Sequence, residues 1–230
     1  MLLYCFPHAG GADSPYRSWG DRLAPVEVRV LGRGARFPGR TPTAPDSVTA
    51  LAEACADHLA GERRPYLFLG HSLGALIAFE TTRALAARGC RGPEVLFATG
   101  HVAPHLPSPG PKLAALPTAE FWAEVRALGG TPPELLGQAA LREAAEPGLR
   151  AEFRAAETYR YVPGQPLGCR IVALAGTDDD RAPADQCAAW RLHTTGGFAL
   201  HTVPGGHFFV ADNPGPVLER IRQESASPVR

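Results

Sequence analysis

Short apolar segments alternate along this chain with stretches of helical hydrophobic spacing, and this alternation constrains the fold more than any other feature. Short apolar runs are typical of strands that are buried on both faces, and helices between them favour a parallel sheet covered on both sides. The predicted strands are residues 2–6, 26–31, 66–69, 95–99, 171–175 and 198–203. The predicted helices are residues 16–23, 47–60, 73–87, 184–191 and 214–224. We therefore expect an α/β fold, a mostly parallel central sheet flanked by helices, in a single domain over residues 1–230.

The composition excludes several classes of partner and site. The 23 basic and 23 acidic side chains cancel, so no overall field attracts nucleic acid or an anionic membrane. No apolar run approaches the roughly 20 residues that span a bilayer. The five cysteines are scattered and form no Cys-x-x-Cys pair, which argues against a disulfide framework or a metal site. Residues 1–6 are typical of a first strand and not of a signal peptide, so we expect a cytoplasmic protein with reduced thiols.

The sequence Gly-His-Ser-Leu-Gly at residues 70–74 lies between a predicted strand and a predicted helix. In this context the pattern Gly-x-Ser-x-Gly predicts a nucleophile elbow. The flanking glycines let strand and helix approach closely, and the sharp turn exposes the hydroxyl of Ser72. The start of the helix also supplies unpaired N–H groups where an oxyanion forms. We expect Ser72 to be a catalytic nucleophile.

A serine nucleophile needs a base, and the base needs an orienting carboxylate. The strand predicted at 171–175 leads into three consecutive acids, Asp178, Asp179 and Asp180, at the edge where such sheets place catalytic groups. The residues alone do not separate these three candidates. The last strand leads into Pro-Gly-Gly-His at 204–207, and this loop can bring His207 to the serine. The chain order serine, acid, histidine is that of α/β-hydrolases.

The other histidines have less direct interpretations. His101 and His105 follow a strand end and can line a cleft, whereas His71 is expected to pack with its side chain away from the serine's partner. Three further histidines are expected at the surface: His58, His193 and His201.

An oxyanion hole needs two converging N–H groups, one from the residue after the serine and one from the loop after an early strand. The first is Leu73. The loop at residues 6–11, Phe-Pro-His-Ala-Gly-Gly, supplies the second, for which Ala9 is our candidate. His8 is expected to brace this loop.

About 70 residues separate the strand that ends near 99 from the one that starts near 171, far more than an ordinary crossover. Apolar residues recur there at helical spacing, including Phe121 and Trp122, and predict two or three amphipathic helices. For each such residue taken alone, packing in a core is the better interpretation. As a group we expect residues 111–161 to form a helical lid, with Phe121 and Trp122 facing the substrate chamber and hinges at Gly129-Gly130 and Pro163-Gly164.

With these motifs the chain resembles the type II thioesterases of polyketide and nonribosomal peptide biosynthesis, which have the α/β-hydrolase fold. The resemblance covers nearly the whole chain and is most specific in Cys-Phe-Pro-His-Ala-Gly-Gly at 5–11 and Pro-Gly-Gly-His-Phe-Phe at 204–209. The family places its catalytic aspartate 11 residues before the tryptophan of an Ala-Trp motif, here Trp190, which selects Asp179. Two departures stand out: Asp180 replaces the usual proline, and residues 30–36 are shorter than the family's segment.

The resemblance implies an editing enzyme that hydrolyses aberrant acyl groups from phosphopantetheine on acyl or peptidyl carrier proteins. Ser72, Asp179 and His207 would be its triad, with no metal and no cofactor. The alternatives are a medium-chain fatty acyl thioesterase, a carboxylesterase with the same triad, and a catalytically inactive carrier-protein-binding module.

Overall fold

The computed structural model describes residues 1–11, 14–31 and 47–226. From the sequence, Asp46 and Ser47 are both candidate caps for the helix predicted at residues 47–60. Asp46 and residues 32–36 lie outside the described part. The strands are β1 (Leu2–Phe6), β2 (Glu27–Val30), β3 (Tyr66–His71), β4 (Val95–Thr99), β5 (Arg170–Gly176) and β6 (Phe198–Val203). The helices are α1 (Ser14–Arg17), α2 (Trp19–Leu23), α3 (Val48–Leu59), α4 (Leu73–Ala87), α5 (Thr118–Leu128), α6 (Pro133–Gly137), α7 (Ala139–Thr158), α8 (Ala184–Cys187), the 3₁₀ helix η1 (Ala188–His193), α9 (Phe209–Asp212) and α10 (Pro214–Ala226).

The described strands form one sheet of six in the order β2-β1-β3-β4-β5-β6, and every pairing between them is parallel. The strand order reverses between β1 and β3, which are direct neighbours. In open parallel sheets this reversal opens a crevice at the carboxyl ends of the strands, where ligands bind. The predicted α/β architecture is confirmed, and the loops after β1 and β3 lie at this point.

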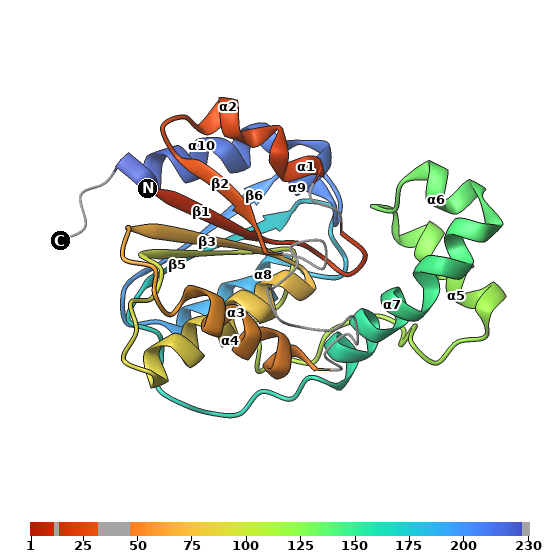
Figure 1. The fold of residues 1–230 in the computed structure, drawn as a ribbon, viewed down its shortest axis with the longest axis horizontal. Coiled ribbons are helices and arrows are strands. Elements are labelled where there is room, and N and C mark those ends of the chain that lie inside the picture. Colours follow the sequence, from red (N-terminus) through yellow and green to blue (C-terminus); the bar gives the residue numbers. More distant parts are fainter. Residues whose placement is uncertain (12–13, 32–46, 227–230) are drawn as a thin grey trace.

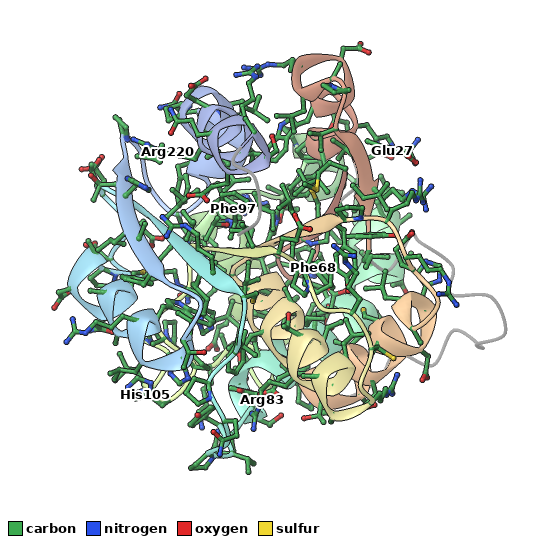
Figure 2. The ribbon with its side chains drawn as sticks, turned by 90° about the vertical axis from the view of Figure 1, so that its left-hand side faces the viewer. Glu27, Phe68, Arg83, Phe97, His105 and Arg220 are labelled. Carbon is green, nitrogen blue, oxygen red and sulfur yellow. The ribbon has the colours of Figure 1, made fainter. Side chains whose placement is uncertain are left out.

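Helices cover both faces of the sheet (Figure 1): α3 and α4 lie on one face, and α1, α2, α9 and α10 lie on the other. Alternate residues of each strand point to opposite faces, as a pleated strand requires. Phe68 of β3 packs in the cluster under α3 and α4, whereas Phe97 of β4 packs in the cluster under α10 (Figure 2). The inner strands β1, β3, β4 and β5 are therefore buried on both sides, which explains their largely apolar sequences, whereas the edge strands β2 and β6 are partly exposed.

Local signals determine where several elements begin and end. The side chain of Ser47 accepts a hydrogen bond from the Ala50 N–H at 3.2 Å and caps α3. Helix α4 ends at Ala87, and Gly89 follows with φ +65°, a conformation that glycine adopts without strain. All five cysteines are free, and Cys5, Cys55 and Cys187 are buried.

The long insertion forms helices α5, α6 and α7, which extend to one side of the sheet (Figure 1). They share a hydrophobic cluster of their own, built on Phe121, Trp122 and Leu149. Helix α7 also returns to the main body, where the Tyr159 hydroxyl donates a hydrogen bond to Glu80 of α4 at 2.6 Å. In the described part of the chain, no helix is both long and apolar enough to cross a membrane.

Candidate active site

Ser72 occupies a sharp turn between β3 and α4. Its backbone has φ 54° and ψ −121°, and it is the single non-glycine residue with positive φ in the described chain. Such a conformation costs about 1–3 kcal/mol and persists where the surrounding structure enforces it. The Ser72 N–H donates to the Thr99 carbonyl at the end of β4 at 2.9 Å, which fixes the turn from one side.

The two glycines of the elbow are required by close backbone approach. A Cβ on Gly70 would overlap the backbone at Gly74, and a Cβ on Gly74 would overlap the carbonyl oxygens of Phe6 and Pro7. The elbow therefore rests directly on the end of β1, beside the loop that carries Ala9. This contact explains the paired glycines better than conformational freedom does, because neither glycine has positive φ.

His207 and Asp179 form a hydrogen-bonded pair at the ends of β6 and β5. The Nδ1 of His207 lies 2.9 Å from Oδ2 and 3.1 Å from Oδ1 of Asp179. The carboxylate side chain is fully buried, whereas the imidazole is 13% exposed. A carboxylate on Nδ1 keeps the proton there and leaves Nε2 free to act as a base.

Asp179 differs from its two acidic neighbours in burial and in partners. Asp178 and Asp180 are exposed, whereas the Asp179 carboxylate also accepts the N–H groups of Arg181 at 3.0 Å and Ala182 at 3.2 Å. Burial raises the pKa of Asp179, but the hydrogen bond and charge of His207 and the two N–H groups outweigh it, so its pKa is lowered. The carboxylate therefore remains ionised beside the imidazole at neutral pH.

A cavity of about 610 Å³ brings Ser72 and His207 together with the predicted oxyanion residues Ala9 and Leu73. The segment 100–113 after β4 and the end of α7 form most of the remaining wall, with Leu76 and Arg181. The predicted positions of two further histidines in the cleft are confirmed: His101 and His105.

The loop after β1 is held against the elbow by helix α7. The Gly10 N–H donates to the carboxylate of Glu152 at 2.5 Å, and the Leu149 side chain packs where a Gly10 Cβ would lie. The Leu73 N–H is the first of α4 and has no acceptor within the helix. The Ala9 N–H donates no hydrogen bond to another described residue. Both groups are thus available to a ligand in the cavity.

His71 is buried, as expected for a packing residue, but the expectation that it points away from the serine's partner was wrong. Its ring centroid lies 5.3 Å from that of His207, because Gly100, which has no side chain, leaves room for both rings. Its Nδ1 lies 3.1 Å from the Thr99 hydroxyl. Burial, with His207 and His8 nearby, lowers its pKa well below the usual value, so it remains neutral.

His8 packs edge-on against Phe208, with ring centroids 4.9 Å apart. Burial lowers the pKa of His8 to about 4, helped by His207 and opposed by a hydrogen bond to the Gly130 backbone. His8 thus connects the loop after β1 with the Gly129-Gly130 turn at the end of α5. Burial also lowers the pKa of His101 to about 4.

The expected surface position of His193 was wrong. Its Nε2 lies 2.7 Å from Nδ1 of His105, and its ring packs against Phe79, Tyr161 and Trp190. Phe79 and Tyr161 come from segments far from His193 in the sequence, so the residues around His193 do not indicate its burial. Burial, together with His105 and Arg83, lowers the pKa of His193 to about 4.

Phe121 and Trp122 lie in the cluster that α5 shares with α7. Phe121 packs against Trp122 and Phe153, and the Arg150 guanidinium lies 4.1 Å from its ring centroid. Neither aromatic is among the described residues that line the cavity, whereas Phe153 is. The sequence motifs did not indicate several polar residues of the cavity wall, among them Glu157, Tyr159 and Arg181. Among the described residues, no group of three or more metal-ligating side chains is close enough to hold a metal ion.

This fold, with a serine elbow after β3 and acid and histidine loops after β5 and β6, defines a protein of the α/β-hydrolase class. Residues 2–224 match the thioesterase domain family. The chain is 38% identical to the thioesterase PikA5 of Streptomyces venezuelae, over 92% of this chain and 76% of that protein. It is 40% identical to the linear gramicidin dehydrogenase LgrE of Brevibacillus parabrevis, over 96% of this chain and 86% of that protein.

The structure of BorB, a type II thioesterase from the borrelidin cluster, superposes with a TM-score of 0.84 at 34% identity, over 97% of this chain and 91% of that chain. The chain belongs to the thioesterase family and is a hydrolytic enzyme.

Proposed function

We propose that the protein is an editing thioesterase that removes acyl groups from the phosphopantetheine arm of acyl or peptidyl carrier proteins. The observation that carries the proposal is the buried Asp179–His207 pair beside Ser72 in one cavity. Two relatives support the biosynthetic setting, since BorB is described as a type II thioesterase of the borrelidin cluster and YbtT as one from yersiniabactin biosynthesis.

In the proposed reaction, the Ser72 hydroxyl attacks the thioester carbonyl carbon while Nε2 of His207 accepts the hydroxyl proton. Asp179 stabilises the imidazolium that forms, because its ionised carboxylate lies against Nδ1. The N–H groups of Ala9 and Leu73 bind the oxyanion of the tetrahedral intermediate. The carbon–sulfur bond then breaks, and the arm thiol leaves with the proton from His207.

The remaining acyl-serine ester is hydrolysed by the same groups. His207 takes a proton from water, the hydroxide attacks the ester carbonyl, and the ester bond to Ser72 breaks. The serine oxygen regains its proton from His207, and the free carboxylic acid leaves. No step needs a group beyond the chain's own residues and water.

We further propose that helices α5–α7 act as a lid over this site. Support comes from α7, which contributes Phe153, Ala156 and Glu157 to the cavity wall and contacts the loop after β1 through Glu152. Phe121 and Trp122 would then shape the acyl chamber indirectly, because Phe121 packs against the cavity residue Phe153. The glycine pair at 129–130 lies against Phe208, the neighbour of His207, and is our candidate hinge.

A comparison of three substrates with the same acyl group tests the proposal: an acyl-carrier protein, the acyl-coenzyme A and the p-nitrophenyl ester. We expect kcat/KM to be highest for the carrier-bound thioester. A preference for the ester would identify a carboxylesterase, and a preference for the acyl-coenzyme A would identify a fatty acyl thioesterase. Binding of the carrier without turnover would identify an inactive binding module.

A further inference from the structure

The cavity that contains Ser72 is lined by more positive than negative charge. Its described lining residues include Lys112, Arg160 and Arg181, with Glu157 as the one carboxylate among them. This excess is local, because the chain as a whole has no net charge. Cations that face a partly enclosed cavity attract anionic ligands more strongly than the same cations on an open surface.

Arg181 is the half-buried member of this group, whereas Lys112 and Arg160 are exposed. Its guanidinium lies against Gly110 in the segment after β4. Among the described residues, no carboxylate forms a hydrogen bond or ion pair with this guanidinium. Arg150, in contrast, is paired with Glu146 at 2.8 Å and bonded to two carbonyl groups.

The acidic groups near Arg181 already have other partners. Asp179 is bonded to His207, and Glu157 accepts the N–H groups of Leu113 at 2.5 Å and Ala114 at 3.1 Å. Burial lowers the pKa of Arg181, and the more distant charges of Asp179, Glu124 and Glu157 oppose this shift. A partly desolvated guanidinium without a bonded partner has five N–H donors to offer to a ligand.

Arg181 is also close to the reacting atoms along the chain. It lies two residues after Asp179, so their Cα atoms are at most about 7 Å apart. The Asp179 carboxylate contacts His207, which lines the cavity with Ser72. A thioester bound at Ser72 therefore places its substituents within the region that the long Arg181 side chain can reach.

We propose that Arg181 is a specificity residue, which binds an anionic oxygen group that the thioester substrate carries away from its scissile carbonyl. This inference rests on the proposed function. Carboxylates and phosphates both suit a guanidinium, since each can accept two parallel N–H groups. In this substrate class the anion is either a terminal carboxylate on the acyl chain or the phosphate of the pantetheine arm.

Two matched pairs of thioesters separate the two sources. Succinyl- and butyryl-N-acetylcysteamine have the same chain length and differ in a terminal carboxylate. Butyryl-phosphopantetheine and butyryl-pantetheine differ in the phosphate. The measured quantity in each pair is the ratio of kcat/KM for the charged thioester to kcat/KM for the neutral one, in the wild type, Arg181→Met, Arg181→Gln and Arg181→Lys.

We expect Arg181→Met and Arg181→Gln to lower one ratio by about tenfold or more, the loss that follows from one hydrogen bond to a charged group. The pair that responds identifies the anion, and Arg181→Lys should recover part of the ratio. Arg154→Met is the matched control, because Arg154 is an exposed arginine of α7 that is not among the described cavity residues. Damage to the neighbouring Asp179 would lower both rates of a pair together and leave the ratio intact.

Equal ratios in the wild type and in both neutral Arg181 variants, for both pairs, would overturn the inference while leaving the proposed function untouched. If the wild type hydrolysed none of the four thioesters, the proposed function would fail, and the inference with it.

Discussion

Replacing Asp179 with asparagine should abolish most activity, and the structure explains why this acid and not its neighbours is needed. The Asp179 carboxylate is fully buried against Nδ1 of His207 and also receives two backbone N–H groups. An asparagine keeps the size but presents either an N–H group or a carbonyl to the imidazole. Where the amide donates, the proton of His207 moves to Nε2, and the ring no longer accepts the serine proton.

The expected loss is about a thousandfold in kcat or more, which corresponds to about 4 kcal/mol in activation free energy. It combines the wrong tautomer with the loss of the negative charge that stabilises the imidazolium. Asp178→Asn and Asp180→Asn serve as matched controls, because both side chains are exposed and neither is bonded to His207. Each should change kcat by less than about threefold, since surface substitutions shift free energies by roughly 0.5 kcal/mol.

The assay is steady-state hydrolysis of a butyryl thioester by the three variants, with thermal unfolding monitored to confirm that each one is folded. A loss in Asp178→Asn or Asp180→Asn that exceeds the loss in Asp179→Asn would refute the reasoning. So would an Asp179→Asn enzyme with near-normal turnover.

Three further outcomes are expected. Gly74→Ala should lower turnover at least about tenfold, because the new Cβ overlaps the backbone at the end of β1. Gly20 lies in open space within α2, so the control Gly20→Ala should be neutral or slightly stabilising. Equal activity in the two variants would contradict the contact between the elbow and β1. Phe121→Glu should change acyl-chain preference or rate more than it lowers the melting temperature of the sheet, because Phe121 belongs to the cluster of α5 and α7. Loss of the whole fold without a selective kinetic effect would contradict the lid proposal. The free energy of unfolding should fall as the pH drops from about 6.5 to about 4. In the folded protein His8 and His101 have pKa values of about 4, so in this window the unfolded chain binds more protons than the folded one. Urea titrations that show a constant or rising free energy of unfolding over this range would contradict the prediction.

The inner part of the sheet could be predicted from the sequence because β1, β3, β4 and β5 are buried on both faces. The predicted limits of β1, β4 and β6 agree with the structure to the residue, and α4 begins directly after the serine as the elbow pattern requires. Local chemistry was sufficient here, since short apolar runs between turn residues are typical of strands that are covered on both faces. The cap at Ser47 has the same local origin.

Contacts between distant segments could not be predicted in this way. The burial of His193 depends on aromatic residues from α4 and from the segment after α7. The bond from the Gly10 N–H to Glu152 joins residues that are 142 positions apart. The turn after β5 buries the side chain of Asp179 and exposes those of Asp178 and Asp180. Three identical residues in a row do not indicate which of them will be buried.

The most direct test of the account is the turnover of purified Ser72→Ala with a butyryl thioester of a carrier protein. Alanine keeps the Cβ, so the strained turn and the fold should persist, which circular dichroism and the melting temperature can verify. We expect kcat to fall by about a thousandfold or more, with a remnant from the oxyanion donors. Substantial turnover by a folded Ser72→Ala protein would contradict the claim that Ser72 is the nucleophile.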